Sequence, residues 1–169
     1  MPTIPFDQLP DDAHIWIFAA DQPITGAAAA RFLGAVDDFL AHWHAHGAPL
    51  TNGRDWREER FLTIGVDDWA THASGCSIDG LFRVFKALRA ELGASFLGGG
   101  RIFYRDEDGV VRLTTRTAFA EQAASGTGAI GPSTPVFDTS LTTLGDWRRR
   151  FELPAARSWH AELLPGATR

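Results

Sequence analysis

The sequence THASGCSIDGLFRVFKALRAELG runs from Thr71 to Gly93 and leads from a turn of small residues into a helix. Its apolar residues recur every three or four positions and so share one helical face; they are Ile78, Leu81, Phe82, Phe85, Leu88 and Leu92. Ser74 or Ser77 can cap the start of this helix, and Gly93 supplies a left-handed stop. The preceding FLTIGVDD, Phe61 to Asp68, has the composition of a buried strand. We therefore predict strand, loop, turn and helix in that order.

The only cysteine, Cys76, lies in the turn that opens this helix. Free backbone N–H groups and the positive end of the helix dipole favour an anion at such a position, so a thiolate there would be favoured and reactive. The alternative is a buried packing residue, the more common role of a lone cysteine among small residues. Asp79 follows closely, and its charge suits the helix dipole without any catalytic role.

The remaining elements follow from the same patterns. We expect strands at 14–20, 101–105, 110–114 and 136–138, a long helix over 26–46, a short helix over 115–125, and a polar loop over 48–59. The DEDG sequence at 106–109 is expected to be the turn of a hairpin that pairs the strands on either side of it. The resulting order, β-α-β-α-β-β-α-β, favours an α+β fold built as a two-layer sandwich with a mixed sheet; a three-layer open sheet is the alternative. We expect residues 1–13 to be an irregular lead-in and residues 14–169 to form a single domain with a docked C-terminal tail.

Composition limits the classes of function. The chain has 169 residues, of which 44% are hydrophobic and 22% charged, as in an ordinary soluble globular protein. A net charge of -5 argues against a nucleic-acid surface, which is normally basic. The N-terminal segment lacks the pattern of a signal peptide, and no apolar run is long enough to cross a bilayer. We therefore expect a cytoplasmic bacterial protein with neither nucleic acid nor membrane as partner.

Histidines and arginines form the other candidate groups. His42 and His46 in HWHAHG are four apart, a spacing at which two helical imidazoles can hold one metal ion, but two histidines need further ligands. No metal site and no cofactor are therefore predicted. Arg54, Arg57 and Arg60 could line a pocket for an anion, although local ion pairs in a solvated loop are the more common role of such residues.

Several segments together resemble a known family. They are HIWIFAA at 14–20, Trp43-x-Ala45-His46-Gly47 followed by Pro49-Leu50, Arg60-Phe61 before the strand that contains Asp67, Ser74-Gly75-Cys76-Ser77-Ile78-Asp79, Tyr104-Arg105, Pro154 and Ser158-Trp159-His160-Ala161. The set resembles a family of small uncharacterised bacterial proteins with an SGCSID motif, often labelled "ABC transporter ATPase". That label conflicts with this sequence, because its single lysine, Lys86, lies inside a predicted helix and not after the glycine of a phosphate-binding loop. The resemblance implies a site that gathers His46, Arg60, Cys76, Ser77, Asp79 and His160.

Three hypotheses of function follow. The first is a domain of unassigned biochemical role that binds a small ligand or a protein partner around the Cys76 turn, or acts as a homo-oligomer; its ligand-binding residues would be Arg60, Ser74, Ser77 and His160. The second is a thiol-dependent enzyme in which Cys76 is the nucleophile, His46 the base and Asp79 the group that orients it. The third is a histidine-ligated metal protein. The reactivity of the Cys76 thiol distinguishes the first hypothesis from the second.

Overall fold

The computed structural model describes residues 3–45, 47–67, 75–97 and 99–166. The chain divides into two compact units. Unit one comprises Met1–Leu97 and Leu141–Gly145, and unit two comprises Gly98–Ser140 and Asp146–Arg169. None of the helices in the described part of the chain combines the length and the hydropathy that crossing a membrane requires.

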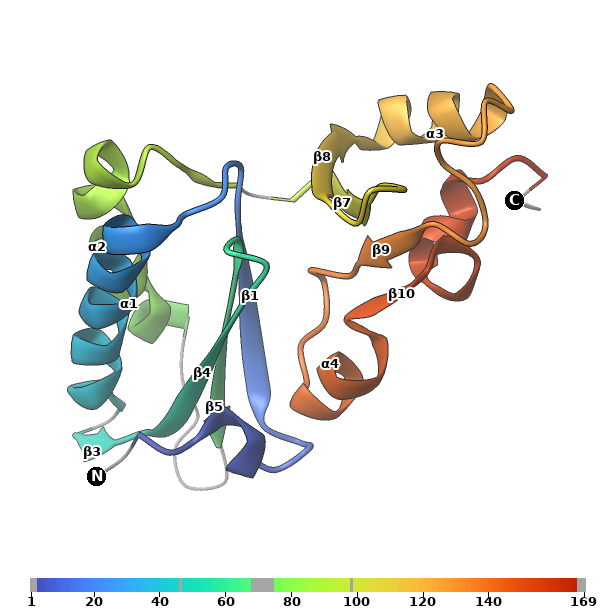
Figure 1. Ribbon diagram of the computed structural model, residues 1–169. Coiled ribbons are helices and arrows are strands. Elements are labelled where there is room, and N and C mark those ends of the chain that lie inside the picture. Colours follow the sequence, from blue (N-terminus) through green and yellow to red (C-terminus); the bar gives the residue numbers. More distant parts are fainter. Residues whose placement is uncertain (1–2, 46, 68–74, 98, 167–169) are drawn as a thin grey trace. The chain divides into compact units, whose positions relative to one another are not determined.

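Unit one is an antiparallel sheet covered on one face by two helices (Figure 1). The strand order is β4 (Thr51–Arg57), β5 (Phe61–Asp67), β1 (His14–Ala20) and β6 (Phe96–Leu97), and the helices are α1 (Gly26–Ala41) and α2 (Gly75–Leu92). A small ribbon of β2 (His44–Ala45) and β3 (Ala48–Pro49) lies between α1 and β4 in the chain. This unit has the two layers that the sequence predicts.

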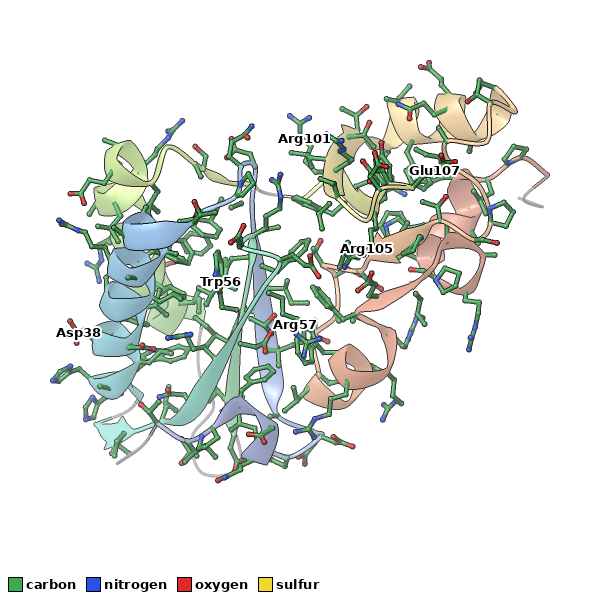
Figure 2. All side chains as sticks on the ribbon, viewed as in Figure 1. Asp38, Trp56, Arg57, Arg101, Arg105 and Glu107 are labelled. Carbon is green, nitrogen blue, oxygen red and sulfur yellow. The ribbon has the colours of Figure 1, made fainter. Side chains whose placement is uncertain are left out.

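Alternation along the strands builds the core of unit one. Side chains two residues apart in a strand point to the same face, and the face toward the helices carries the aromatic and aliphatic residues Trp16, Phe18, Trp56, Leu62, Ile64 and Val66. Phe32 of α1 is fully buried among them and contacts Trp56 at a ring-centroid distance of 5.5 Å. Figure 2 shows Trp56 on the helix side of β4 and its neighbour Arg57 on the opposite side.

The N-terminal segment is tied to the edge of this sheet. Phe6–Gln8 forms one turn of 3₁₀ helix, and the backbone N–H of Ile4 donates to the carbonyl of Asn52 at 2.8 Å. A Cβ atom on Gly53 would lie 2.6 Å from the carbonyl oxygen of Ile4, closer than real Cβ contacts allow. Glycine at position 53 is thus what lets the N-terminal segment cross β4.

Unit two contains a second antiparallel sheet, of order β10 (Glu152–Pro154), β9 (Pro135–Phe137), β7 (Arg101–Arg105) and β8 (Val111–Thr115). The other elements are α3 (Arg116–Ala124), most of α4 (Leu144–Arg150) and the short 3₁₀ helices η2 (Ala155–Arg157) and η3 (Trp159–Leu163). Ile102, Phe119, Ile130, Val136 and Ala155 form its buried core.

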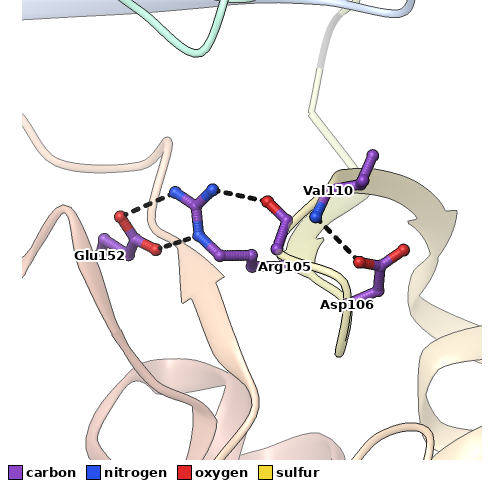
Figure 3. A network of polar contacts seen from close by, with 5 residues as sticks. Arg105, Asp106, Val110 and Glu152 are labelled. Carbon is purple, nitrogen blue, oxygen red and sulfur yellow. Dashed lines mark hydrogen bonds and ion pairs between the residues drawn. The ribbon is translucent and has the colours of Figure 1, made fainter.

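One arginine connects three parts of unit two. The guanidinium of Arg105 donates from Nε to Oε1 of Glu152 at 2.8 Å and from Nη1 to the carbonyl of Gly109 at 2.9 Å (Figure 3). The Asp106 carboxylate accepts the backbone N–H groups of Asp108 and Val110, and so organises the β7–β8 turn. The prediction that the DEDG sequence is a turn is confirmed.

The α+β class is confirmed, but several details of the prediction are wrong. All strand pairs within the described sheets are antiparallel, so neither sheet is mixed. The segment predicted as a loop over 48–59 contains β4, which pairs with β5 along its length. Its polar composition concealed it, because the arginines of β4 are held in ion pairs: Arg54 with Asp37, and Arg57 with Asp55.

The first helix ends earlier than the histidine pattern predicts, at Ala41 and not at His46. Asn52, fully buried, donates from its side-chain amide to the carbonyls of Leu40 and Leu50 at 3.0 and 2.9 Å. That tertiary hydrogen bond satisfies a carbonyl at the helix end and allows the chain to turn there. Since His42 follows the last helical residue, a two-histidine site on one helical face is wrong for this pair. The element order is also longer than predicted, with β2, β3, β4, β6, α4 and β10 added.

Candidate functional site

The residues predicted around the Cys76 turn fall largely beyond the part that the structure describes. Ser74 and His46 lie outside the described residues. Cys76 and Ser77 belong to the first turn of α2, but their side chains are outside the description as well. Asp79 is exposed on the same helix. The thiol chemistry and the binding role predicted for this turn therefore stay predictions.

Arg60 makes structural contacts at the end of β1. Its guanidinium donates from Nη1 to the carbonyl of Asp21 at 2.8 Å and to that of Ala20 at 3.4 Å. The local ion pairs expected for Arg54 and Arg57 are confirmed, with Arg54 Nη2 2.7 Å from Asp37 Oδ2 and Arg57 Nε 2.9 Å from Asp55 Oδ2. Burial raises the pKa of Asp55, and the neighbouring Arg57 opposes that shift.

His160 belongs to unit two, next to the residues that line a pocket of about 380 Å³. The lining combines two arginines, two hydroxyl side chains, two glycines and an indole; these residues are Gly99, Gly100, Arg101, Arg116, Thr139, Ser140 and Trp159. All of them belong to unit two, so this pocket is complete within one compact part of the chain.

The register of the sheet explains why these residues meet. Arg101, labelled at the start of β7 in Figure 2, pairs with Thr115, and Arg116 follows directly as the first residue of α3. On the other side of β7, Phe103 pairs with Phe137 and Tyr104 with Val136. β9 ends at Phe137, and Thr139, two residues further on, lines the same pocket as Arg101. The chain segments that follow β8 and β9, the two strands beside β7, thus both contribute residues to the same pocket.

Asp138 holds two of the lining residues in place. It is only 3% exposed, and its Oδ1 accepts hydrogen bonds from the indole Nε1 of Trp159 at 3.1 Å and from the backbone N–H of Ser140 at 3.0 Å. The Ser140 hydroxyl donates to the same oxygen. A buried carboxylate needs such donors, and here the donors are residues of the pocket wall.

The two arginines give the pocket its charge. The Arg116 guanidinium lies over the Trp159 ring, with its Cζ 4.8 Å from the ring centroid. Across the described ranges of the chain, no carboxylate forms an ion pair with Arg101 or Arg116, in contrast to Arg54, Arg57, Arg105 and Arg112. A guanidinium carries several N–H donors in a planar fork that matches a carboxylate or a phosphate. The pocket therefore presents positive charge and unused donors to solvent.

His160 lies behind the indole and is neutral at physiological pH. Its ring stacks on Trp159 at a centroid distance of 3.9 Å, and its Nδ1 lies 2.9 Å from Ser158 Oγ. The pKa of His160 is lowered from 6.5 to about 4, mainly by burial; the charge of Asp138 opposes this shift and the positive charge of Arg116 contributes to it. A neutral imidazole adds no third cation beside Arg101 and Arg116, and its contact with the pocket lining is the stack on Trp159.

This lowered pKa predicts a pH dependence of stability. Below pH 6.5 the His160 imidazole binds a proton in the unfolded chain but stays neutral in the folded protein. The free energy of unfolding therefore has its full value above pH 6.5 and decreases as the pH falls from 6.5 toward about 4. Over that window we expect the shift to cost about 3 kcal/mol in the free energy of unfolding. Urea unfolding of the wild type and of His160→Gln between pH 7.5 and pH 4 measures it.

The His160→Gln variant should have a flatter pH profile than the wild type in that window. The exposed His44 provides the matched control, because His44→Gln should leave the wild-type slope unchanged. Parallel pH profiles for the wild type and His160→Gln would contradict the burial-induced pKa shift.

Reasoning from the sequence alone missed Arg101, Arg116, Asp138 and Ser140. The available signal was slight: an Asp-Thr-Ser sequence that begins at the last residue of a predicted strand, which is typical of a side-chain-capped turn. Within the described residues no group of three or more histidine, cysteine, aspartate or glutamate side chains could hold a metal ion. Comparison with protein-family models, with curated proteins and with solved structures finds no match for this chain.

Proposed function

We propose that this protein binds a small anionic ligand, and that the pocket of unit two is its binding site. The observation that carries the proposal is the pair Arg101 and Arg116, which share one pocket and form no ion pair with any carboxylate in the described parts of the chain. An anionic group held between two such guanidinium groups would receive charge-assisted hydrogen bonds, which are about twice as strong as neutral ones.

The neighbouring groups narrow the class of ligand. Thr139 supplies a hydroxyl group beside the arginines, and Trp159, which contacts Arg116 and His160, supplies the part of its indole that stays exposed. Asp138 uses its Oδ1 on Ser140 and Trp159, so these two residues are fixed before any ligand arrives. Such preorganisation reduces the entropic cost of binding. The ligand class that suits this lining is a phosphate or carboxylate on a small planar or apolar body.

Isothermal titration calorimetry with inorganic phosphate, benzoate and phenyl phosphate tests this proposal. We expect saturable binding of at least one of these anions, with phenyl phosphate favoured because it engages both the arginines and the indole. Arg101→Ala and Arg116→Ala should each weaken binding about tenfold, the loss expected for one hydrogen bond to a charged group. The indole N–H signal of Trp159 in an NMR titration should shift on binding.

Arg157→Ala is the matched control for these variants. Arg157 is an exposed arginine of the same unit that does not line the pocket, so its loss changes the net charge equally and should leave the affinity within about twofold, since exposed charges are screened over about 8 Å at physiological salt. The proposal fails if none of the three anions saturates the protein, or if all three arginine variants lose affinity alike.

The Cys76 turn remains the subject of a separate prediction. A reactive thiol at this turn would support the thiol-dependent enzyme, and an inert one would support the packing role. Neither outcome bears on the Arg101–Arg116 pocket, because that pocket is formed by residues of unit two alone and Cys76 belongs to unit one.

A further inference from the structure

Unit one contains a second pocket, of about 330 Å³, between α2 and the start of β6. Its volume lies at the lower end of the range of about 300–1,000 Å³ that is typical of ligand sites. Its lining divides into an apolar part and a cationic part, namely Phe82, Phe85, Ala94 and Phe96 on one side and Lys86 and Arg89 on the other, with Ser95 at the border.

The apolar part is a cluster of aromatic rings with one ring exposed. Phe85 and Phe96 stack at a centroid distance of 4.5 Å, and Phe96 stacks in turn on the buried Phe32 at 5.1 Å. Phe82 meets the edge of Phe85 at 6.1 Å, yet its side chain is 51% exposed. Burial of the exposed part of the Phe82 ring would be energetically favourable. An apolar ligand in this pocket would cover that surface.

Asp21, which does not line the pocket, holds Ser95 in place on the side of the pocket opposite α2. The Asp21 carboxylate accepts the backbone N–H of Ser95 at 2.7 Å, and the Asp21 N–H donates to the Ser95 carbonyl at 2.9 Å. The Ser95 hydroxyl makes no hydrogen bond with another described residue and is available to a ligand. This part of the pocket is therefore formed before a ligand binds.

The cationic part consists of side chains without partners of opposite charge. Lys86 and Arg89 lie three apart on α2, which places them on neighbouring positions of one helical face. Neither forms an ion pair with a described carboxylate, and Glu91, the acid nearest to them in the sequence, is paired with Arg31 at 3.0 Å. Two cations at the rim of an aromatic pocket match a ligand with an apolar body and an acidic head.

We propose that this second pocket binds a small amphiphilic carboxylate, a molecule with a short aliphatic or aromatic body and one anionic group. The body would lie against Phe82, Phe85 and Phe96. The carboxylate would lie between Lys86 and Arg89, within reach of the Ser95 hydroxyl. This site is separate from the pocket of unit two and does not depend on the function proposed for it.

Titration with sodium octanoate below its micellar concentration, followed by calorimetry, tests the inference. Saturable binding is expected for octanoate, and binding at least about tenfold weaker for the neutral octanol, because an alcohol lacks the charge that Lys86 and Arg89 engage. The double variant Lys86→Glu/Arg89→Glu should lose octanoate binding. Both side chains are exposed, so the variant should fold, as a far-UV circular dichroism spectrum would confirm.

Two controls make the result specific to this pocket. Arg57→Glu alters the charge of unit one at an exposed residue on the side of β4 away from the helices, which does not line the pocket, and should leave the affinity within about twofold at physiological salt. Arg101→Ala/Arg116→Ala should also leave octanoate binding unchanged. Absence of saturable octanoate binding, equal affinity for octanol, or loss of binding in the Arg101→Ala/Arg116→Ala variant would each overturn the proposal.

Discussion

Replacement of Phe32 by alanine should lower the free energy of unfolding by about 3–5 kcal/mol, the largest effect we expect from any single substitution in this chain. Phe32 is fully buried in α1 and contacts three aromatic rings: Trp56 at 5.5 Å, Phe85 at 5.7 Å and Phe96 at 5.1 Å. These rings come from β4, α2 and β6, so a cavity at position 32 would loosen the contacts of α1 with all three elements.

Denaturant unfolding measured by circular dichroism checks this prediction, and hydrogen exchange resolved by peptide assigns the loss to unit one. Phe82→Ala is the matched control: it removes the same side chain from a position that is 51% exposed and should cost about 1 kcal/mol or less. Equal destabilisation by Phe32→Ala and Phe82→Ala would contradict the burial of Phe32 at the centre of this core.

Replacement of Asp138 by alanine should cost about 2–4 kcal/mol and should also abolish anion binding in the pocket of unit two. The substitution leaves the Trp159 indole N–H and the Ser140 backbone N–H without their acceptor, and a buried donor that loses its partner costs about 1–3 kcal/mol. Released from Asp138, both Ser140 and Trp159 would leave the positions in which they line the pocket.

Asp138→Asn separates the two effects. An amide oxygen can still accept from Trp159 and Ser140, so this variant should keep most of the stability and of the phenyl phosphate affinity that Asp138→Ala loses. Asp108→Ala removes an exposed carboxylate of the same unit and should change stability by no more than about 0.5 kcal/mol. Full anion affinity in Asp138→Ala would show that Asp138 does not position the pocket wall.

Local sequence patterns determined the α+β class and most of its elements. The three- and four-residue spacing from Ile78 to Leu92 predicts α2, because this spacing places the apolar side chains on one face of a helix, which packs against the core. The aliphatic and aromatic run at 14–20 is β1, and the two short strands around DEDG pair as predicted, Arg101–Arg105 with Val111–Thr115. In each case the pattern that predicts the helix or strand lies within fewer than twenty residues. It reflects the local preference of those residues for helix or strand, which packing then stabilises.

Only the tertiary structure decided the elements whose partners are distant in sequence. β4 is a strand because β5 pairs with it and Asp37 of α1 neutralises Arg54, and neither partner can be read from residues 51–57. The end of α1 at Ala41 is held by the distant Asn52, which donates to the Leu40 carbonyl. The pocket of unit two brings Arg101 together with Arg116 and Thr139, which are distant in the sequence. A charged residue looks the same in the sequence whether its side chain is solvated, forms an ion pair or lies in a binding site. Strand register and burial determine which of these three it does.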